Sequence, residues 1–338
     1  MMKDKVYIIA EVGPNHNGDL NLALKMIDEI AKTGVDAIKF QMYNPLELYS
    51  ADAIMAKYQK ENVDTKDVLE MSRNHHLLPE EHLQLYHKCK ELGVDYICTA
   101  FDMDSMLYLD ENCDMAYYKI ASGEIYSLDI LEYMAQKKKP IIMSTGMIDF
   151  DAISDILNIL NKKEKQDITI LHCISNYPAK YEEVNLRNMS EIKNRFKCQV
   201  GFSDHTIGNE CAIAAVAMGA TVIEKHVTLD KSLPGPDHKA SIDIPELQNL
   251  VNSIRHIELA MGSYERLFTE AQKEVASVAR KSIVARRDIA KGEIIRREDI
   301  CFKRPGIGIS PLDYQKVVGR KAVVDIVHNR VIKIEQIV

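Results

Sequence analysis

Apolar residues along the chain follow two alternating spacings, one typical of buried strands and one typical of helices. Short runs rich in β-branched residues are each followed by a longer segment with helical spacing of its apolar positions. The predicted strands are 6–11, 37–41, 95–99, 116–120, 140–144, 168–172, 198–202 and 220–223. The predicted helices are 20–32, 79–92, 105–110, 128–136, 150–160, 186–196, 209–218 and 245–261.

Eight strand-then-helix units in ~260 residues have the length and rhythm of a (β/α)8 barrel. A doubly wound open sheet is the alternative, but such a sheet usually has fewer strands and a glycine-rich first turn. The segment 13–18 lacks the glycine spacing that opens a dinucleotide site. We therefore expect an α/β protein with a TIM barrel over residues 1–263, interrupted by an insertion at 42–78.

The pattern changes after the last predicted helix. Residues 264–280 are polar and only weakly helical, which indicates a linker. From 281 to 338, short β runs are separated by Lys-Gly and Pro-Gly turns, which predicts a small β-rich domain. Because a domain of this size is marginally stable by itself, we expect it to dock on a barrel.

Composition narrows the class of protein. The 338 residues are 46% hydrophobic and 28% charged, as in a folded globular protein. The net charge of −7 and the absence of a Lys/Arg cluster argue against nucleic acid and anionic membranes as partners. The start shows no signal-peptide pattern, and no apolar run is long enough to span a bilayer. Seven cysteines without Cys-x-x-Cys spacing are expected to be reduced thiols in the cytoplasm.

Two histidines follow neighbouring predicted strands. Because consecutive parallel strands end at the same edge of a sheet, His205 and His226 are expected to lie side by side. Such a pair can share one metal ion, and with only two protein ligands the ion would keep open positions for substrate. The alternative is two histidines that are hydrogen-bonded in a polar rim.

Polar side chains occur at all eight predicted strand ends. Lysines, short hydroxyl residues and the histidine pair together suit a small, multiply charged anion beside a divalent cation. Among these strand-end residues, His16 is expected either to orient Glu11 or to close a turn. The strand ends carry Glu11, Lys39, Thr99, Lys119, Ser144, His172, Ser203 and Glu224. By contrast, the histidines at 75, 76, 82 and 87 lie in a polar insertion or on an exposed-looking helix and are expected to be solvated.

Several motifs closely resemble those of the sialic acid synthase family, in the family's order and along the whole chain. They lie at 8–19, 39–41, 119–124, 144–147, 201–206, 224–230, 234–241 and 303–309. The resemblance implies a (β/α)8 barrel followed by a C-terminal antifreeze-like (β-clip) domain, paired as a domain-swapped homodimer. It also implies condensation of phosphoenolpyruvate with an N-acetylated hexose to give a nine-carbon 2-keto acid and phosphate.

The resemblance implies roles for individual residues. His205 and His226 would hold the metal, with Glu224 reached through water, and Glu11 would be the general base. Mn²⁺ is the expected ion, with Mg²⁺ and Co²⁺ as alternatives. Phosphate would contact Lys39, Ser144, Ser175 and Ser203, and the carboxylate would contact Thr99, Lys119 and Ser122. The sugar would face Asn62, Tyr177 and Asp237, with Arg304 supplied by the partner's small domain. Ser175 departs from the pattern, because some members carry Asn there.

The acceptor sugar is the open point of the resemblance. The segment 235–241 is similar both to N-acetylneuraminate synthases and to N,N'-diacetyllegionaminate synthases, and it differs from the pseudaminate type. We expect N-acetylmannosamine as acceptor, with 2,4-diacetamido-2,4,6-trideoxymannose as the alternative. Pseudaminate synthesis, a pyruvate aldolase and a non-catalytic carbohydrate-binding protein are further alternatives.

Overall fold

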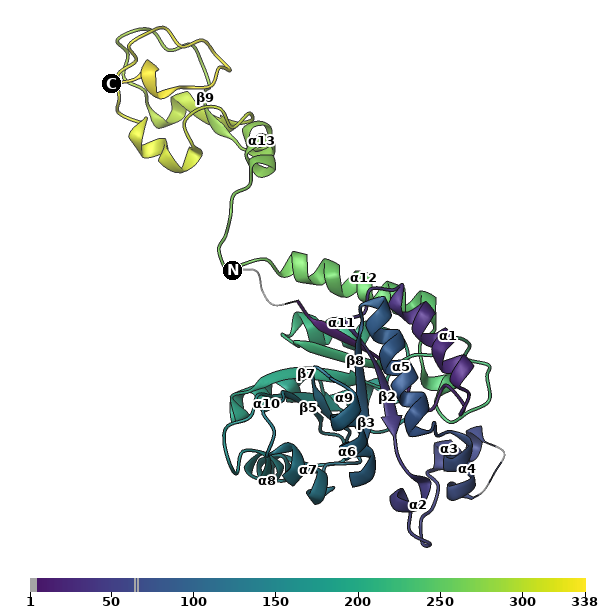
Figure 1. Cartoon of the computed structure of the whole chain (residues 1–338). Coiled ribbons are helices and arrows are strands. Elements are labelled where there is room, and N and C mark those ends of the chain that lie inside the picture. Colours follow the sequence, from purple (N-terminus) through teal and green to yellow (C-terminus); the bar gives the residue numbers. More distant parts are fainter. Residues whose placement is uncertain (1–4, 64, 66) are drawn as a thin grey trace. The chain divides into compact units, whose positions relative to one another are not determined.

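The computed structural model describes residues 5–63, 65 and 67–338. The chain divides into two compact units, Met1–Gly262 and Ser263–Val338 (Figure 1). Among the described residues, no helix combines the length and apolar character needed to cross a membrane.

The first unit contains one parallel sheet of eight strands. The strands are β1 (Tyr7–Glu11), β2 (Ala37–Met42), β3 (Asp95–Ala100), β4 (Tyr118–Ile120), β5 (Ile141–Ser144), β6 (Ile168–Cys173), β7 (Gln199–Asp204) and β8 (Val222–His226). Their order in the sheet is β3-β2-β1-β8-β7-β6-β5-β4, and the two end strands β3 and β4 are in contact. The sheet is thus a nearly closed barrel, and the (β/α)8 prediction is confirmed.

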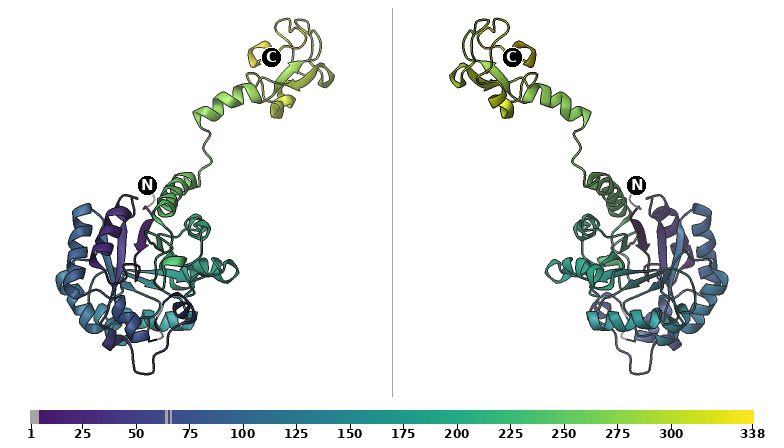
Figure 2. Two further views of the ribbon diagram at one scale, coloured as in Figure 1. Left: turned by 90° about the vertical axis from the view of Figure 1, so that its right-hand side faces the viewer. Right: turned by 90° about the vertical axis from the view of Figure 1, so that its left-hand side faces the viewer.

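Helices surround the strands of this unit, as the side views in Figure 2 show. They are α1 (Leu20–Ala31), α5 (Pro79–Leu92), α6 (Met103–Asn112), α7 (Leu128–Met134), α8 (Phe150–Leu160), α9 (Tyr181–Val184), α10 (Arg187–Phe196), α11 (Glu210–Ala217) and α12 (Ile244–Met261). Helix α1 begins where the Asp19 side chain accepts hydrogen bonds from two backbone N–H groups. It buries Ala23, Met26, Ile27 and Ile30, a stripe of helical period that packs on the barrel.

The insertion between β2 and α5 forms three short helices, α2 (Pro45–Leu48), α3 (Lys57–Asn62) and α4 (Val68–Asn74). Met55, Val68 and Met71 form a small apolar core of the insertion, separate from the barrel core. The insertion also contacts loops at the carboxyl ends of the strands. Asn62 Nδ2 donates to the Pro236 carbonyl at 3.2 Å, and Lys239 Nζ donates to Asn62 Oδ1 at 2.9 Å.

The second unit is a small β-rich domain with its own core. It contains α13 (Glu270–Ala279), the antiparallel pair β9 (Ser282–Ala285) and β10 (Ile300–Lys303), and the short 3-10 helices η2 (Arg297–Asp299), η3 (Pro311–Lys316) and η4 (Ile334–Gln336). Isolated bridges such as Ile289–Ile326 and Ala322–Ile337 connect its remaining segments. Residues of these segments, among them Ile283, Ile295 and Ile332, form the core.

One side-chain cluster near the amino end of β4 supports a stability prediction. Asp110 on α6 accepts hydrogen bonds from the Tyr118 hydroxyl, from the Tyr133 hydroxyl at 2.7 Å and from Lys137 Nζ at 2.8 Å. Burial alone would raise the pKa of Asp110, but Lys137 and the two hydroxyls outweigh burial and lower it to about 2.

We expect Asp110→Asn to lower the free energy of unfolding by about 1–2 kcal/mol at pH 7, because three donors lose a charged acceptor. The pKa of Asp110 is depressed in the folded state. Its contribution is therefore complete above the ordinary carboxyl pKa of about 3.9 and declines as the pH falls toward 2. Urea unfolding at pH 7 and pH 3 measures this, with Asp114→Asn at an exposed position as control. Equal losses at both positions would contradict the prediction.

Candidate active site

The carboxyl ends of the barrel strands open on a cavity of about 380 Å³. Twelve of the residues predicted for the site line this one cavity. They are Glu11, Lys39, Lys119, Ser122, Ser144, Ser175, Tyr177, Ser203, His205, Glu224, His226 and Asp237. The charged members at the strand ends are almost fully buried, so the bottom of the cavity, here called the charged floor, is shielded from water.

Three predicted site residues do not line the cavity. Thr99 is buried at the end of β3, and its hydroxyl oxygen has no hydrogen-bond partner among the described residues. Asn62 instead connects α3 to the loop that carries Asp237. Arg304 belongs to the second unit, so its predicted part in the site of a partner stays a prediction.

Strand register sets the centre of the charged floor. Glu11 is the register partner of Lys39 on β2 and of His226 on β8. The Lys39 ammonium lies 2.6 Å from Glu11 Oε2 and 3.9 Å from Glu224 Oε2. Gln41 Nε2 donates to the other Glu11 oxygen at 2.8 Å, so both oxygens of this buried carboxylate face a cation or an N–H group.

A second lysine, Lys119, lies close to Glu224. Lys119 Nζ is 3.6 Å from Glu224 Oε2 and donates to Ser144 Oγ at 2.8 Å and to the Ile120 carbonyl at 3.0 Å. Ser203 Oγ donates to Glu224 Oε1 at 2.9 Å. The floor therefore pairs two buried ammonium groups with two buried carboxylates, which is the condition for keeping such charges out of water.

The two glutamates have opposite pKa shifts. Burial raises the pKa of Glu11, because Lys39 offsets the lost hydration only in part and Glu224 adds a nearby negative charge. For Glu224, burial would also raise the pKa, but Lys119 and Lys39 outweigh it and lower it to about 2. Glu224 is thus a fixed anion, and Glu11 is the carboxylate better able to accept a proton.

The loop after β5 brings hydroxyl groups together. The Gly146 backbone N–H donates to Ser122 Oγ at 2.9 Å. A methyl group added at Gly146 would lie 2.1 Å from Ser175 Oγ and 2.9 Å from Ser122 Oγ. Only glycine therefore lets this loop approach both hydroxyls. Hydroxyl donors beside the Lys119 ammonium form a site suited to anionic oxygens.

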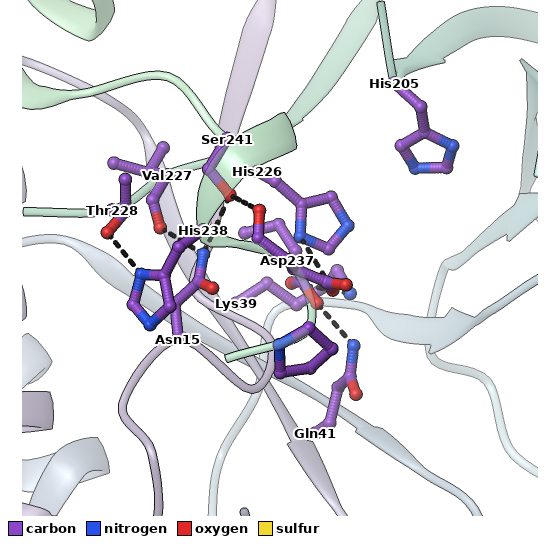
Figure 3. Close-up of polar contacts among 12 residues, drawn as sticks. Asn15, Lys39, Gln41, His205, His226, Val227, Thr228, Asp237, His238 and Ser241 are labelled. Carbon is purple, nitrogen blue, oxygen red and sulfur yellow. Dashed lines mark hydrogen bonds and ion pairs between the residues drawn. The ribbon is translucent and has the colours of Figure 1, made fainter. Parts of the chain in front are cut away.

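The histidine pair lies in the same cavity (Figure 3). The ring centroids of His205 and His226 are 5.4 Å apart, and the Tyr177 ring packs against both. His205 Nδ1 donates to the Ile174 carbonyl at 2.7 Å, so Nε2 is the nitrogen that would ligate a metal, after giving up its proton. Burial would lower the pKa of His205, but the neighbouring Cys173 thiol and the Ile174 carbonyl raise it to about 9.

The donor atoms around this pair fit a divalent cation. His226 Nδ1 is buried without a hydrogen-bond partner, and Asp237 Oδ2 lies 3.6 Å away. Burial and the neighbouring His205 lower the pKa of His226, which favours the neutral ring that ligates metals. Within the described ranges, no three His, Cys, Asp or Glu side chains converge on one point. The chain would therefore offer the two imidazoles and leave positions open to water or substrate.

A hydrogen-bond chain holds the loop that carries Asp237 (Figure 3). Asn15 Nδ2 donates to the Val227 carbonyl at 2.9 Å and to Ser241 Oγ at 2.8 Å. Ser241 Oγ in turn donates to the Asp237 carbonyl at 2.8 Å. His16 takes no part, because its Nδ1 accepts from the Gly18 N–H at 3.0 Å and so closes the turn after β1. These contacts fix Asp237 beside His226.

Sequence reasoning missed one part of the lining. Tyr43, Leu48, Tyr49 and Met71 from the insertion, together with Phe101 after β3, also line the cavity; we call these five residues the apolar wall. The insertion lacks the strand-helix rhythm that located the other residues. Its apolar positions were the available signal, but they did not indicate which surface they cover.

Comparisons with known proteins find matches in both units. The NeuB family matches residues 26–266, and the SAF domain matches residues 280–338. The N,N'-diacetyllegionaminic acid synthase of Campylobacter jejuni is 43% identical over 94% of this chain and 96% of its own length. The enzyme of the same description from Legionella pneumophila is 41% identical over 93% and 90%. The crystal structure of an N-acetylneuraminic acid synthetase from Leptospira borgpetersenii is 34% identical, with a TM-score of 0.72, covering 80% of this chain and 90% of that chain.

Substitution of Gly146 tests the hydroxyl cluster. We expect Gly146→Ala to weaken binding of phosphoenolpyruvate at least ~10-fold, because the added methyl would displace two hydroxyl groups that are predicted to contact the anion, at about 1 kcal/mol each. Isothermal titration calorimetry gives the dissociation constant. Gly123→Ala is the matched control, since Gly123 lines the cavity but its added methyl meets no atom within 4 Å. Unchanged affinity in Gly146→Ala would show that the hydroxyl cluster does not contact phosphoenolpyruvate.

Proposed function

Because this chain belongs to the NeuB family, we propose that it condenses phosphoenolpyruvate with 2,4-diacetamido-2,4,6-trideoxymannose to give N,N'-diacetyllegionaminate and phosphate. The sequence motifs alone favoured N-acetylmannosamine as acceptor. Two relatives described as diacetyllegionaminic acid synthases, at 43% and 41% identity, favour the other acceptor. The observation that carries the reaction class is the single cavity in which a proton-accepting glutamate, two lysines, several hydroxyls and two histidines meet.

The donor would bind on the charged floor. In this proposal the phosphate contacts Lys39, Ser144, Ser175 and Ser203, while the carboxylate contacts Lys119 and Ser122, with Thr99 behind them. The support is the buried pair of ammonium groups and the hydroxyls around Gly146. Groups fixed in advance around an anion stabilise charge that develops during the reaction.

The acceptor would present its aldehyde to the histidine pair, with Tyr177, Asp237 and Asn62 toward the rest of the sugar. A divalent cation, Mn²⁺ by preference and otherwise Mg²⁺ or Co²⁺, held by His205 and His226 with Glu224 reached through water, would polarise the aldehyde. The Asn15–Ser241 contacts keep Asp237 in place for the sugar.

The bond changes balance with one water molecule. Carbon 3 of phosphoenolpyruvate bonds to the aldehyde carbon, and the aldehyde oxygen, first an alkoxide, ends with the proton that Glu11 takes from water. Water then adds to carbon 2 and gives its proton to Glu11, whose raised pKa suits this role. The bond from carbon 2 to the phosphate oxygen breaks, phosphate leaves with the proton of the new carbon 2 hydroxyl, and the 2-keto acid forms.

We also propose that the protein acts as a homodimer in which Arg304 from one chain completes the site of the other, and that it works in the cytoplasm. The second unit exposes Ile307, Leu312 and Ile334, which is apolar surface available for docking. All seven cysteines are free, as a reducing compartment requires.

Phosphate release tests the reaction. With Mn²⁺ and phosphoenolpyruvate, we expect release with the diacetamido sugar, weaker release with N-acetylmannosamine, and none without acceptor or with excess chelator. Glu11→Gln should lower kcat ~100-fold or more because the proton acceptor is lost, whereas Lys39 keeps Glu224 as a charge partner at 3.9 Å. Glu47→Gln, at an exposed glutamate, is the control. Absence of release with both sugars would overturn the proposed reaction.

Subunit complementation tests the dimer. Arg304→Ala and Glu11→Gln chains should each be inactive as homodimers. Coexpressed with two different tags, their heterodimer would carry one site with both residues intact. Since random pairing makes half of the dimers mixed, and each has one intact site of two, about a quarter of wild-type activity should return. No recovery in purified heterodimers would place Arg304 outside the partner's site.

A further inference from the structure

The apolar wall contrasts with the charged floor of the same cavity. None of the described insertion residues that line the cavity is Lys, Arg, Asp or Glu. Floor residues such as Glu11 and Lys119 are 1% and 2% exposed, whereas Leu48 and Tyr49 are only half-buried. Leu48 and Tyr49 therefore lie nearer to solvent than the reacting groups, whereas Met71 is as buried as those groups.

The wall is held in place by the insertion itself. Met71 belongs both to the cavity lining and to the small core with Met55 and Val68. The Tyr43 ring packs edge to face with Phe101, with centroids 5.9 Å apart. Its hydroxyl donates to the Ser72 carbonyl at 3.4 Å.

Loop contacts fix the insertion at its other end. The Asn62 side chain is hydrogen-bonded to the Pro236 carbonyl and to Lys239, both in the loop that carries Asp237. Gly18 lies so close to α4 that an added methyl would be 2.6 Å from the Asn74 carbonyl oxygen. The apolar wall is therefore formed before a sugar arrives, so a ligand does not have to order it.

The orientation of the acceptor follows from where the chemistry occurs. If the aldehyde meets the histidine pair on the floor, the far carbons of the sugar point toward the mouth, where the wall lies. Those carbons distinguish the two acceptors. The diacetamido sugar carries an acetamido group at carbon 4 and a methyl group at carbon 6, where N-acetylmannosamine carries hydroxyls.

We infer that Leu48 and Met71 form a subsite for the far end of the acceptor and select a 6-deoxy, N-acylated hexose. This inference rests on the proposed function. Methyl groups packed on Leu48 and Met71 leave water, which is favourable. A hydroxyl at the same place would lose its water partners, and neither the Leu48 nor the Met71 side chain carries an N–H or O–H group to replace them.

The test is acceptor preference in Leu48→Asn. With saturating phosphoenolpyruvate and Mn²⁺, kcat/KM is measured for both sugars by phosphate release. We expect the preference for the diacetamido sugar to fall on the order of 10-fold, because one apolar contact gives discrimination of that size. Leu46→Asn is the matched control, since Leu46 lies on the same short helix, is 63% exposed and does not line the cavity. Leu48→Met, which keeps an apolar side chain, should retain the wild-type preference.

Two outcomes count against the proposals in different ways. If Leu48→Asn lowers kcat/KM equally for both sugars, or matches Leu46→Asn, the subsite is wrong while the proposed function stands. If wild-type protein releases no phosphate with either sugar, the proposed function is wrong. Calorimetric binding of the two sugars to wild-type and Leu48→Asn protein then decides the subsite by itself, since a retained preference in the variant overturns it.

Discussion

The site depends on the mutual neutralisation of four buried charges at the carboxyl ends of the barrel strands. Lys39 and Lys119 lie 3.9 Å and 3.6 Å from the same oxygen of Glu224, and Glu11 pairs with Lys39. Removing one member would leave another charged group unpaired out of water, which costs about 3–5 kcal/mol. The cluster also requires the register of β1 with β2, because a slip by one residue would turn Glu11 to the other face of the sheet. The fold of the barrel and the position of its charged residues therefore depend on the same pairing of β1 with β2.

Most of the barrel was predictable from sequence, because strands and helices have different apolar periods and the carboxyl ends of parallel strands always meet. That rule alone collected Glu11, Lys39 and the histidine pair. For His82, the polar residue type led to a wrong prediction of solvent exposure. It was expected to be solvated, yet it is fully buried and its Nδ1 lies 2.8 Å from the Tyr96 hydroxyl. It shares a helical stripe with Leu85 and Cys89 on α5, so the period contained the correct answer.

Contacts between distant segments were beyond the sequence. The approach of Gly146 to Ser122 and Ser175 depends on the path of two loops, which no local pattern encodes. Likewise, Asn62 bonds the Pro236 carbonyl and Lys239 across 174 and 177 residues of chain. The register of parallel strands is set by side-chain period and burial, whereas loop contacts are set by packing that only the folded chain reveals.

The insertion has its own core, so the cavity lining consists of two structurally separate parts. Donor chemistry lies on strands whose register the whole barrel maintains, whereas most of the apolar wall is carried by one continuous segment with its own core of Met55, Val68 and Met71. Such a segment can diverge, or be exchanged between related proteins, without disturbing the four buried charges. The barrel can thus keep the residues for carbon–carbon bond formation unchanged while substitutions in the insertion alter the choice of sugar.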